Sequence, residues 1–133
     1  ERYVKLLEQN QVIIFIDESS INEHKITKKA WSSRNKRNIR FNYGRLNSIS
    51  VIGAIDKTGL LNYSINSESN TSEDFISFID NTQKILEKDS FYSNMLYKKM
   101  VTIILDNSKL HTSKITRNFL KKSKFNVIYQ PSY

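Results

Sequence analysis

Two short apolar runs, each ending in an aspartate, constrain the fold of this chain more than any other feature of its sequence. The first is VIIFID at 12–17 and the second is MVTIILD at 100–106. Unbroken runs of β-branched and aliphatic residues predict strands in the middle of a sheet, covered on both faces. Asp17 and Asp106 therefore stand at the carboxyl ends of two buried strands.

An antiparallel hairpin is predicted between these two strands. SISVIGAI at 48–55 and LLNYSI at 60–65 flank Asp56-Lys57-Thr58-Gly59, which has the composition of a turn. We expect Asp56 to stabilise this turn rather than to act as an acid. FNVIYQP at 125–131 predicts a last strand.

After the hairpin, apolar residues recur at three- and four-residue steps, which predicts a helix. Asn70 or Thr71 can cap a helix with Glu73 or Asp74, and its apolar face is predicted to hold Phe75, Phe78, Ile79, Thr82, Ile85 and Leu86. The irregular stretch at 89–99 is predicted to be a loop. A second helix should start at Thr112 or Ser113 and end near 124, with Ile115, Phe119 and Leu120 facing inward. The order of elements predicts an α/β sheet that mixes an antiparallel hairpin with parallel strands.

Composition narrows the class of protein. At 133 residues the chain suits one domain, and without cysteine it can form neither disulfides nor thiolate sites. No apolar run reaches the roughly 18 residues of a membrane span, so we expect an intracellular protein without a membrane partner. Because the sequence starts without Met and stops abruptly at QPSY, we expect a fragment of a longer protein.

All of the excess positive charge lies in one segment, residues 24–45, here called the basic segment. The chain has 21 Lys+Arg and 13 Asp+Glu, a net charge of +8. The basic segment carries eight Lys and Arg residues and no acid, so the rest of the chain is balanced. Trp31, Phe41 and Tyr43 are interleaved with these charges, as is typical of surfaces that bind a polyanion. The alternative is a solvated loop that serves only solubility.

If the two aspartate-terminated strands are parallel neighbours, Asp17 and Asp106 meet at one edge of the sheet. Two adjacent carboxylates repel each other unless one is protonated or a cation lies between them. Oxygen ligands without cysteine favour Mg²⁺ or Mn²⁺ over zinc. Such a site beside a basic surface predicts phosphoryl transfer on a phosphodiester. Taken singly, each aspartate could instead cap a turn or a helix.

Three further residues are candidates for supporting these carboxylates. Because side chains alternate along a strand, the Glu18 side chain should point to the side opposite that of Asp17. We therefore expect Glu18 to support the metal ligands or the fold rather than to bind the metal itself. Asn107 and His111 follow Asp106 closely, and His111 can orient a phosphate or hydrogen-bond the carboxylate. A plain histidine at a helix entrance is the alternative.

Six motifs in order resemble the catalytic domain of the Tc1/mariner and IS630-like transposases, in the DDE superfamily. The resemblance covers nearly the whole chain and implies a ribonuclease-H-like mixed sheet with flanking helices. The matching segments are FIDESS (15–20), AWSSRNKR (30–37), SISVIGAI (48–55), SEDFISFI (72–79), ILDNSKLH (104–111) and VIYQPSY (127–133).

By this resemblance, Asp17 and Asp106 correspond to the first two of three metal-binding acids. The third would lie eight positions past Tyr133, so residues 1–133 would be a catalytic domain cut before it and inactive alone. The intact site would hold two Mg²⁺ or Mn²⁺ ions. The upstream helix-turn-helix region of the family is absent from this sequence.

The resemblance also implies an activity and partners. The full-length protein would cleave DNA at transposon ends and join it to target DNA, as a homodimer, in a eukaryotic nucleus or a bacterial cytoplasm. A catalytically dead or domesticated DNA-binding copy, or another ribonuclease-H-like nuclease, are the alternatives. The residues expected to contact DNA are Lys28, Lys29, Trp31, Arg34, Lys36, Arg37, Arg40, Lys114, Arg117 and Lys121.

Overall fold

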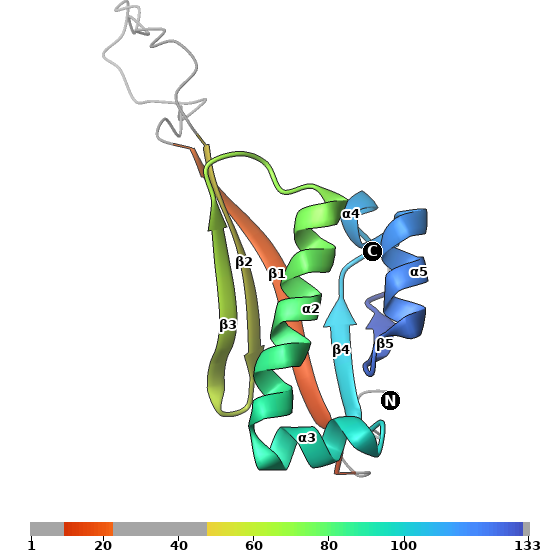
Figure 1. Ribbon diagram of the computed structural model, residues 1–133. Coiled ribbons are helices and arrows are strands. Elements are labelled where there is room, and N and C mark those ends of the chain that lie inside the picture. Colours follow the sequence, from red (N-terminus) through yellow and green to blue (C-terminus); the bar gives the residue numbers. More distant parts are fainter. Residues whose placement is uncertain (1–9, 23–47, 132–133) are drawn as a thin grey trace, which may run out of the picture.

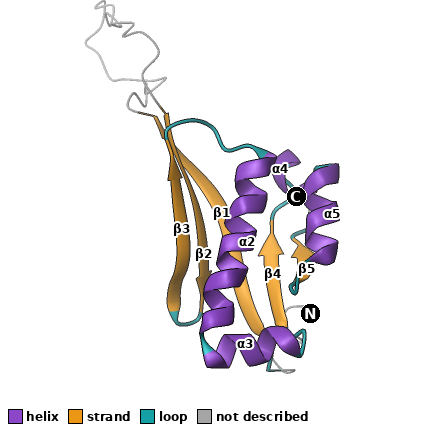
Figure 2. Ribbon diagram, viewed as in Figure 1, coloured by secondary structure: helices purple, strands orange, loops and turns teal. Residues whose placement is uncertain are grey.

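The computed structural model describes residues 10–22 and 48–131, which form a five-stranded mixed sheet with helices against it (Figures 1 and 2). The strand order is β3-β2-β1-β4-β5. The strands are β1 (Val12–Asn22), β2 (Ser48–Asp56), β3 (Gly59–Asn66), β4 (Val101–Leu105) and β5 (Asn126–Tyr129).

β1 is the central strand, as its sequence predicts. It pairs antiparallel with β2 on one side and parallel with β4 on the other, and β4 pairs parallel with β5. The predicted combination of a hairpin with parallel strands is therefore confirmed. β1 is longer than the apolar run, because its pairing with β2 continues to Asn22 opposite Ser48.

The hairpin of β2 and β3 forms where its turn composition predicts. The Asp56 carboxylate accepts hydrogen bonds from the Thr58 backbone N–H at 2.7 Å and from the Thr58 hydroxyl at 2.6 Å. Gly59 has a φ of 125°, which only glycine adopts without strain. Asp56 is thus a turn residue, as expected.

Helix α2 (Ser72–Lys88) begins with the predicted capping box. Thr71 accepts from the Asp74 backbone N–H at 3.2 Å, and the Asp74 carboxylate accepts from the Thr71 backbone N–H at 2.8 Å. These bonds lower the pKa of Asp74. Five of the six predicted inward residues are buried, but Ile85 is 38% exposed and that prediction was wrong.

The stretch predicted to be a loop at 89–99 is mostly helix. Helix α3 (Ser90–Tyr97) begins because Asp89 accepts hydrogen bonds from the backbone N–H groups of Phe91 and Tyr92. α3 is short and buries only Leu96 among its residues. A helix with one buried residue shows no apolar periodicity in its sequence, so periodicity could not predict α3. The capping aspartate was the signal that could have predicted it.

Two helices follow β4. α4 (Lys109–Thr112) is a single turn and α5 (Lys114–Lys122) starts at the predicted cap Ser113. Leu120 is buried and Phe119 packs against the core, but Ile115 is 46% exposed, contrary to prediction. Thr116 is buried in its place, because its hydroxyl donates to the Leu110 carbonyl at 2.9 Å.

The main core lies between one face of the sheet and the helices. Ile14, Ile16, Ile52, Ile103 and Leu105 from the strands join Phe75, Phe78, Ile79 and Leu120 from the helices. On the other face Phe15 is 36% exposed, so the expected cover of β1 on both faces is only partly confirmed. In the parts of the chain that are described, no helix is long and apolar enough to cross a membrane.

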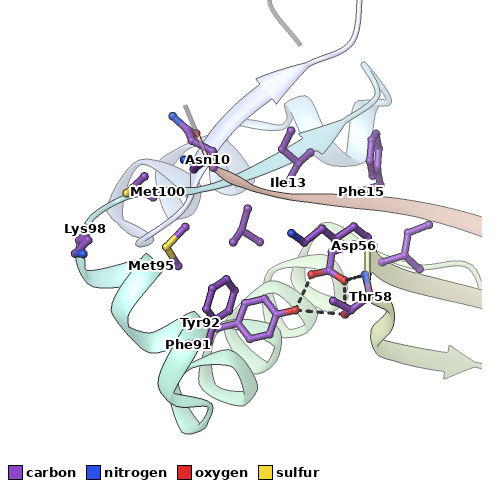
Figure 3. Close-up of a pocket in the computed structure, with 14 residues that line it drawn as sticks. Asn10, Ile13, Phe15, Asp56, Thr58, Phe91, Tyr92, Met95, Lys98 and Met100 are labelled. Carbon is purple, nitrogen blue, oxygen red and sulfur yellow. Dashed lines mark hydrogen bonds between the residues drawn. The ribbon is translucent and has the colours of Figure 1, made fainter. Parts of the chain in front are cut away.

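A hydrogen-bonded contact fastens α3 to the hairpin turn. The Tyr92 hydroxyl donates to Asp56 at 2.6 Å, at the rim of a mostly apolar cavity of about 660 Å³ (Figure 3). Burial opposes ionisation of Asp56, but its hydrogen bonds from Thr58 and Tyr92 outweigh this and lower its pKa. Every oxygen of Asp56 is therefore already engaged in holding the fold.

Removing this contact should destabilise the protein in a pH-dependent way. We expect Tyr92→Phe to lower the free energy of unfolding by about 1 kcal/mol at pH 7. Because the folded pKa of Asp56 is below its ordinary 3.8, the stabilisation is present above that pH and is lost as the pH falls through the folded value. Denaturant unfolding at pH 7, 5 and 3 measures the difference.

Tyr97→Phe is the matched control, because Tyr97 lies in the same helix and is 88% exposed. It should leave the free energy of unfolding unchanged. Equal stability of Tyr92→Phe and the wild type at pH 7, or a gap that widens in acid, would contradict this account.

Candidate active site

β1 and β4, whose apolar runs are each followed by an aspartate, are parallel neighbours. The prediction that Asp17 ends its strand was wrong, because the pairing of β1 with β2 continues to Asn22. In the register of β1 and β4, Val12 lies opposite Val101 and Phe15 lies opposite Ile104. Continued for two residues, the same register sets Asp17 opposite Asp106. Figure 1 shows the two strands side by side, running toward the same edge of the sheet. The two aspartates, 89 positions apart in the sequence, therefore each lie two residues past the last pair of the β1–β4 ladder, Phe15 and Ile104.

Each of these carboxylates is anchored through one oxygen. Oδ1 of Asp17 accepts from the Glu18 backbone N–H at 2.9 Å. Oδ1 of Asp106 accepts from the Ser108 backbone N–H at 2.9 Å and lies 2.7 Å from Nδ1 of His111. Within the described residues, Oδ2 of each aspartate has no protein partner, so both remain available to a ligand.

His111 lies between the two strand ends and is fully buried. Its Nδ1 contacts Asp106, and its Nε2 lies 2.6 Å from Oε1 of Glu18. Burial opposes the charged form, but the hydrogen bond and charge of Glu18, with those of Asp106, outweigh it and raise the pKa of His111. Carboxylate oxygens accept hydrogen bonds, so these two contacts favour a ring that donates from both nitrogens.

The Asp106 carboxylate is stabilised in its ionised form. Its pKa is lowered, mainly by the hydrogen bond from the Ser108 backbone, with the positive charge of His111 adding to the effect and burial opposing it. Ser108 caps α4, so the turn that starts this short helix also holds the aspartate. The strand end and the helix start thus form one local unit.

Two of the residues predicted to support the aspartates, Glu18 and Asn107, have different partners in the structure. Glu18 does lie on the side of β1 opposite Asp17, among the buried residues Ile14 and Ile16, and its contact is with His111. Asn107 does not touch either aspartate, because its amide donates to the Gln130 carbonyl and links the ends of β4 and β5. Sequence reasoning did not find the partner of Glu18.

Phe75 is a site residue that its sequence pattern concealed. Its ring lies 4.4 Å from that of His111, centroid to centroid, at an interplanar angle of 42°. In the sequence it reads as an ordinary member of the apolar face of α2. Only the three-dimensional contact shows that it covers one side of the imidazole ring.

A polar hollow of about 270 Å³ adjoins this edge of the sheet. Several hydroxyl groups and one carboxylate line it together with Leu110, among them Glu18, Ser20, Ser50, Ser69 and Ser108. The larger apolar cavity lies at the other end of β1, beside the hairpin turn (Figure 3). Glu18 and Ser108, which contact His111 and Asp106, line the smaller hollow and not the apolar cavity.

The predicted DNA-contacting residues are divided between two regions. Lys114, Arg117 and Lys121 are exposed on α5, the helix that follows the Asp106 unit. The other seven lie outside the residues that the structure describes: Lys28, Lys29, Trp31, Arg34, Lys36, Arg37 and Arg40.

The two aspartates are ligands of the type that a hard divalent cation prefers, but two are too few to complete a site. Carboxylate oxygens are the ligands that Mg²⁺ and Mn²⁺ prefer, and among the described residues no partner contacts Oδ2 of Asp17 or of Asp106. The described residues hold no cluster of three or more acids and histidines arranged to bind a metal. Two acids need a further ligand to complete such a site.

A mixed sheet with paired acidic strand ends defines a class of nuclease-like domains with a ribonuclease-H-like fold. The sequence profile of the DDE superfamily endonucleases matches residues 12–133. The chain therefore belongs to the DDE superfamily endonuclease family. No curated protein matches it by sequence.

Solved structures of Mos1 transposase share the fold. A Mos1 mariner paired end complex with Mn is 19% identical with a TM-score of 0.64. A pre-cleavage Mos1 transpososome is 15% identical with a TM-score of 0.69. The Mos1 catalytic domain with Raltegravir and Mg is 15% identical with a TM-score of 0.66. Each match covers 98% of this chain but only 40%, 41% and 58% of the respective Mos1 chain.

Proposed function

We propose that this domain is the catalytic core of a cut-and-paste DNA transposase. The observation that carries the proposal is the β1–β4 register, which brings Asp17 and Asp106 to one edge of the sheet in a DDE endonuclease. Mos1 structures of the same fold include complexes of transposon ends and forms with Mn or Mg. The full-length protein would cleave DNA at the ends of an element and join them to target DNA.

The free Oδ2 atoms of Asp17 and Asp106 would hold the metal, with a third acid contributed by chain beyond Tyr133. When bound, two Mg²⁺ or Mn²⁺ ions supply activation of the attacking oxygen and compensation of charge on the leaving oxygen. The protein's part is to hold both carboxylates in fixed orientations. Ser108 and His111 do this for Asp106, and the Glu18 backbone does it for Asp17.

Positive side chains would place the DNA backbone at this edge. α5 presents Lys114, Arg117 and Lys121 to solvent immediately after the Asp106 unit. In the sequence, the basic segment follows the strand that carries Asp17. A homodimer acting on paired ends, in a eukaryotic nucleus or a bacterial cytoplasm, completes the proposal.

Replacing either aspartate tests the catalytic assignment. In the full-length protein, Asp17→Asn or Asp106→Asn should lower Mg²⁺-dependent cleavage of DNA by about 100-fold or more, since loss of a ligand costs at least as much as loss of its outer partner. Binding of the same DNA should be unchanged or stronger, because a negative charge is removed. Strand cleavage and filter binding measure the two effects separately.

Asp80→Asn is the control, because Asp80 is an exposed acid of α2 that pairs with Lys84. It should cleave as the wild type does. Full cleavage by either active-site variant would refute the assigned roles. A wild type that binds DNA and never cleaves it would identify the dead-copy alternative.

The basic segment should contribute affinity without sequence preference. We expect replacement of Lys28, Lys29, Arg34 and Lys36 by Ala to weaken binding to all DNA sequences alike. The slope of log affinity against log salt should fall by about 0.9 for each phosphate contact that is lost.

A variant with Ala at Lys57, Lys84, Lys88 and Lys98 removes the same charge from exposed positions elsewhere. It should change the slope much less. An equal effect of the two variants would show that the net charge, not the basic segment, governs binding.

A further inference from the structure

We infer that Glu18 and His111 are a positioning pair, which sets the orientation of the Asp106 carboxylate for metal binding. The inference rests on the function proposed above and deepens it, because it assigns work to an acid that is not itself a metal ligand. The observation behind it is a continuous chain of contacts from Glu18 on β1, through His111, to Asp106 at the end of β4.

The imidazole of His111 is held from several sides. It is fully buried, and Phe75 packs against its ring at 4.4 Å. Its backbone is fixed as well, since the Tyr129 hydroxyl donates to its carbonyl at 3.1 Å. A ring held in this way cannot turn without breaking buried contacts, so it can fix the orientation of a group that is hydrogen-bonded to it.

Asp106 depends on that ring for its orientation. Its side chain is 50% exposed, so packing does not fix the carboxylate. Oδ1 is held by two donors, the Ser108 backbone N–H and Nδ1 of His111. Two donors on one oxygen define the plane of the group and hence the direction of the free Oδ2. With Ser108 alone, the carboxylate can rotate.

Glu18 acts through His111 rather than on the metal. Its side chain leaves β1 on the core side, opposite Asp17, and its Oε1 lies 2.6 Å from Nε2 of His111. Without this carboxylate, Nε2 loses its hydrogen-bond partner in a buried place, and the ring is no longer held between β1 and the end of β4. The hydrogen bond that orients Asp106 is then no longer enforced.

Manganese binding measured directly tests the pair. In the full-length protein, the electron paramagnetic resonance signal of free Mn²⁺ reports binding, and Mn²⁺-dependent DNA cleavage is followed in parallel. Glu18→Ala and His111→Ala should each weaken Mn²⁺ binding by about 10- to 100-fold. The Mn²⁺ concentration for half-maximal cleavage should rise by the same factor.

Glu18→Gln separates positioning from direct ligation. The glutamine oxygen still accepts from Nε2 of His111, so this variant should bind Mn²⁺ within about threefold of the wild type, in the range expected for a retained hydrogen bond. Glu87→Ala is the control, because Glu87 pairs with Lys124 away from the site. It should leave Mn²⁺ binding unchanged.

Three results would overturn the inference. Wild-type Mn²⁺ binding by Glu18→Ala would show that Glu18 does no positioning. Equal losses in Glu18→Gln and Glu18→Ala would make Glu18 a direct ligand. If Glu18→Ala and His111→Ala lower thermal stability but leave the Mn²⁺ concentration for half-maximal cleavage unchanged, the pair is only a structural contact. If the wild type binds Mn²⁺ but cleaves no DNA, the proposed function fails while the binding comparison still decides the inference.

Discussion

The parallel pairing of β1 with β4 is the constraint on which the rest of this structure depends. Parallel strands hold their residues in step, so two apolar runs of similar length end at the same edge. Each run is followed by an aspartate, so the pairing of the two runs carries both aspartates toward the same edge of the sheet. A shift of one residue would also turn each buried side chain of β1 toward the other face of the sheet. The core therefore enforces the register that the chemistry needs.

The core face and the acidic edge are joined by His111. Its ring lies in the apolar layer against Phe75, while its nitrogens reach carboxylates on β1 and after β4. A buried imidazole ring between two carboxylates is tolerated because both of its nitrogens have hydrogen-bond partners. The same contacts keep Asp106 ionised. The contacts that stabilise this edge of the sheet thus also hold the Asp106 carboxylate.

Much of this arrangement could be predicted from the sequence. Long runs and strong caps identified the central strand, the hairpin, α2 and α5, because burial and capping leave local patterns. α3 escaped because it buries little, and Ile85 and Ile115 were misplaced because helix periodicity alone does not fix the edges of a buried face. The contacts of His111 with Glu18 and Phe75 join segments far apart in the chain, so no local pattern could show them.

A crystal structure of the protein extended past Tyr133 and grown with Mn²⁺ tests the central claim most directly. The account predicts an anomalous scattering peak bound by oxygens of both Asp17 and Asp106, at about 2.1 Å, the distance typical of small hard divalent cations. A peak held by Glu18, or carboxylates of Asp17 and Asp106 that face apart with no ion between them, would contradict it.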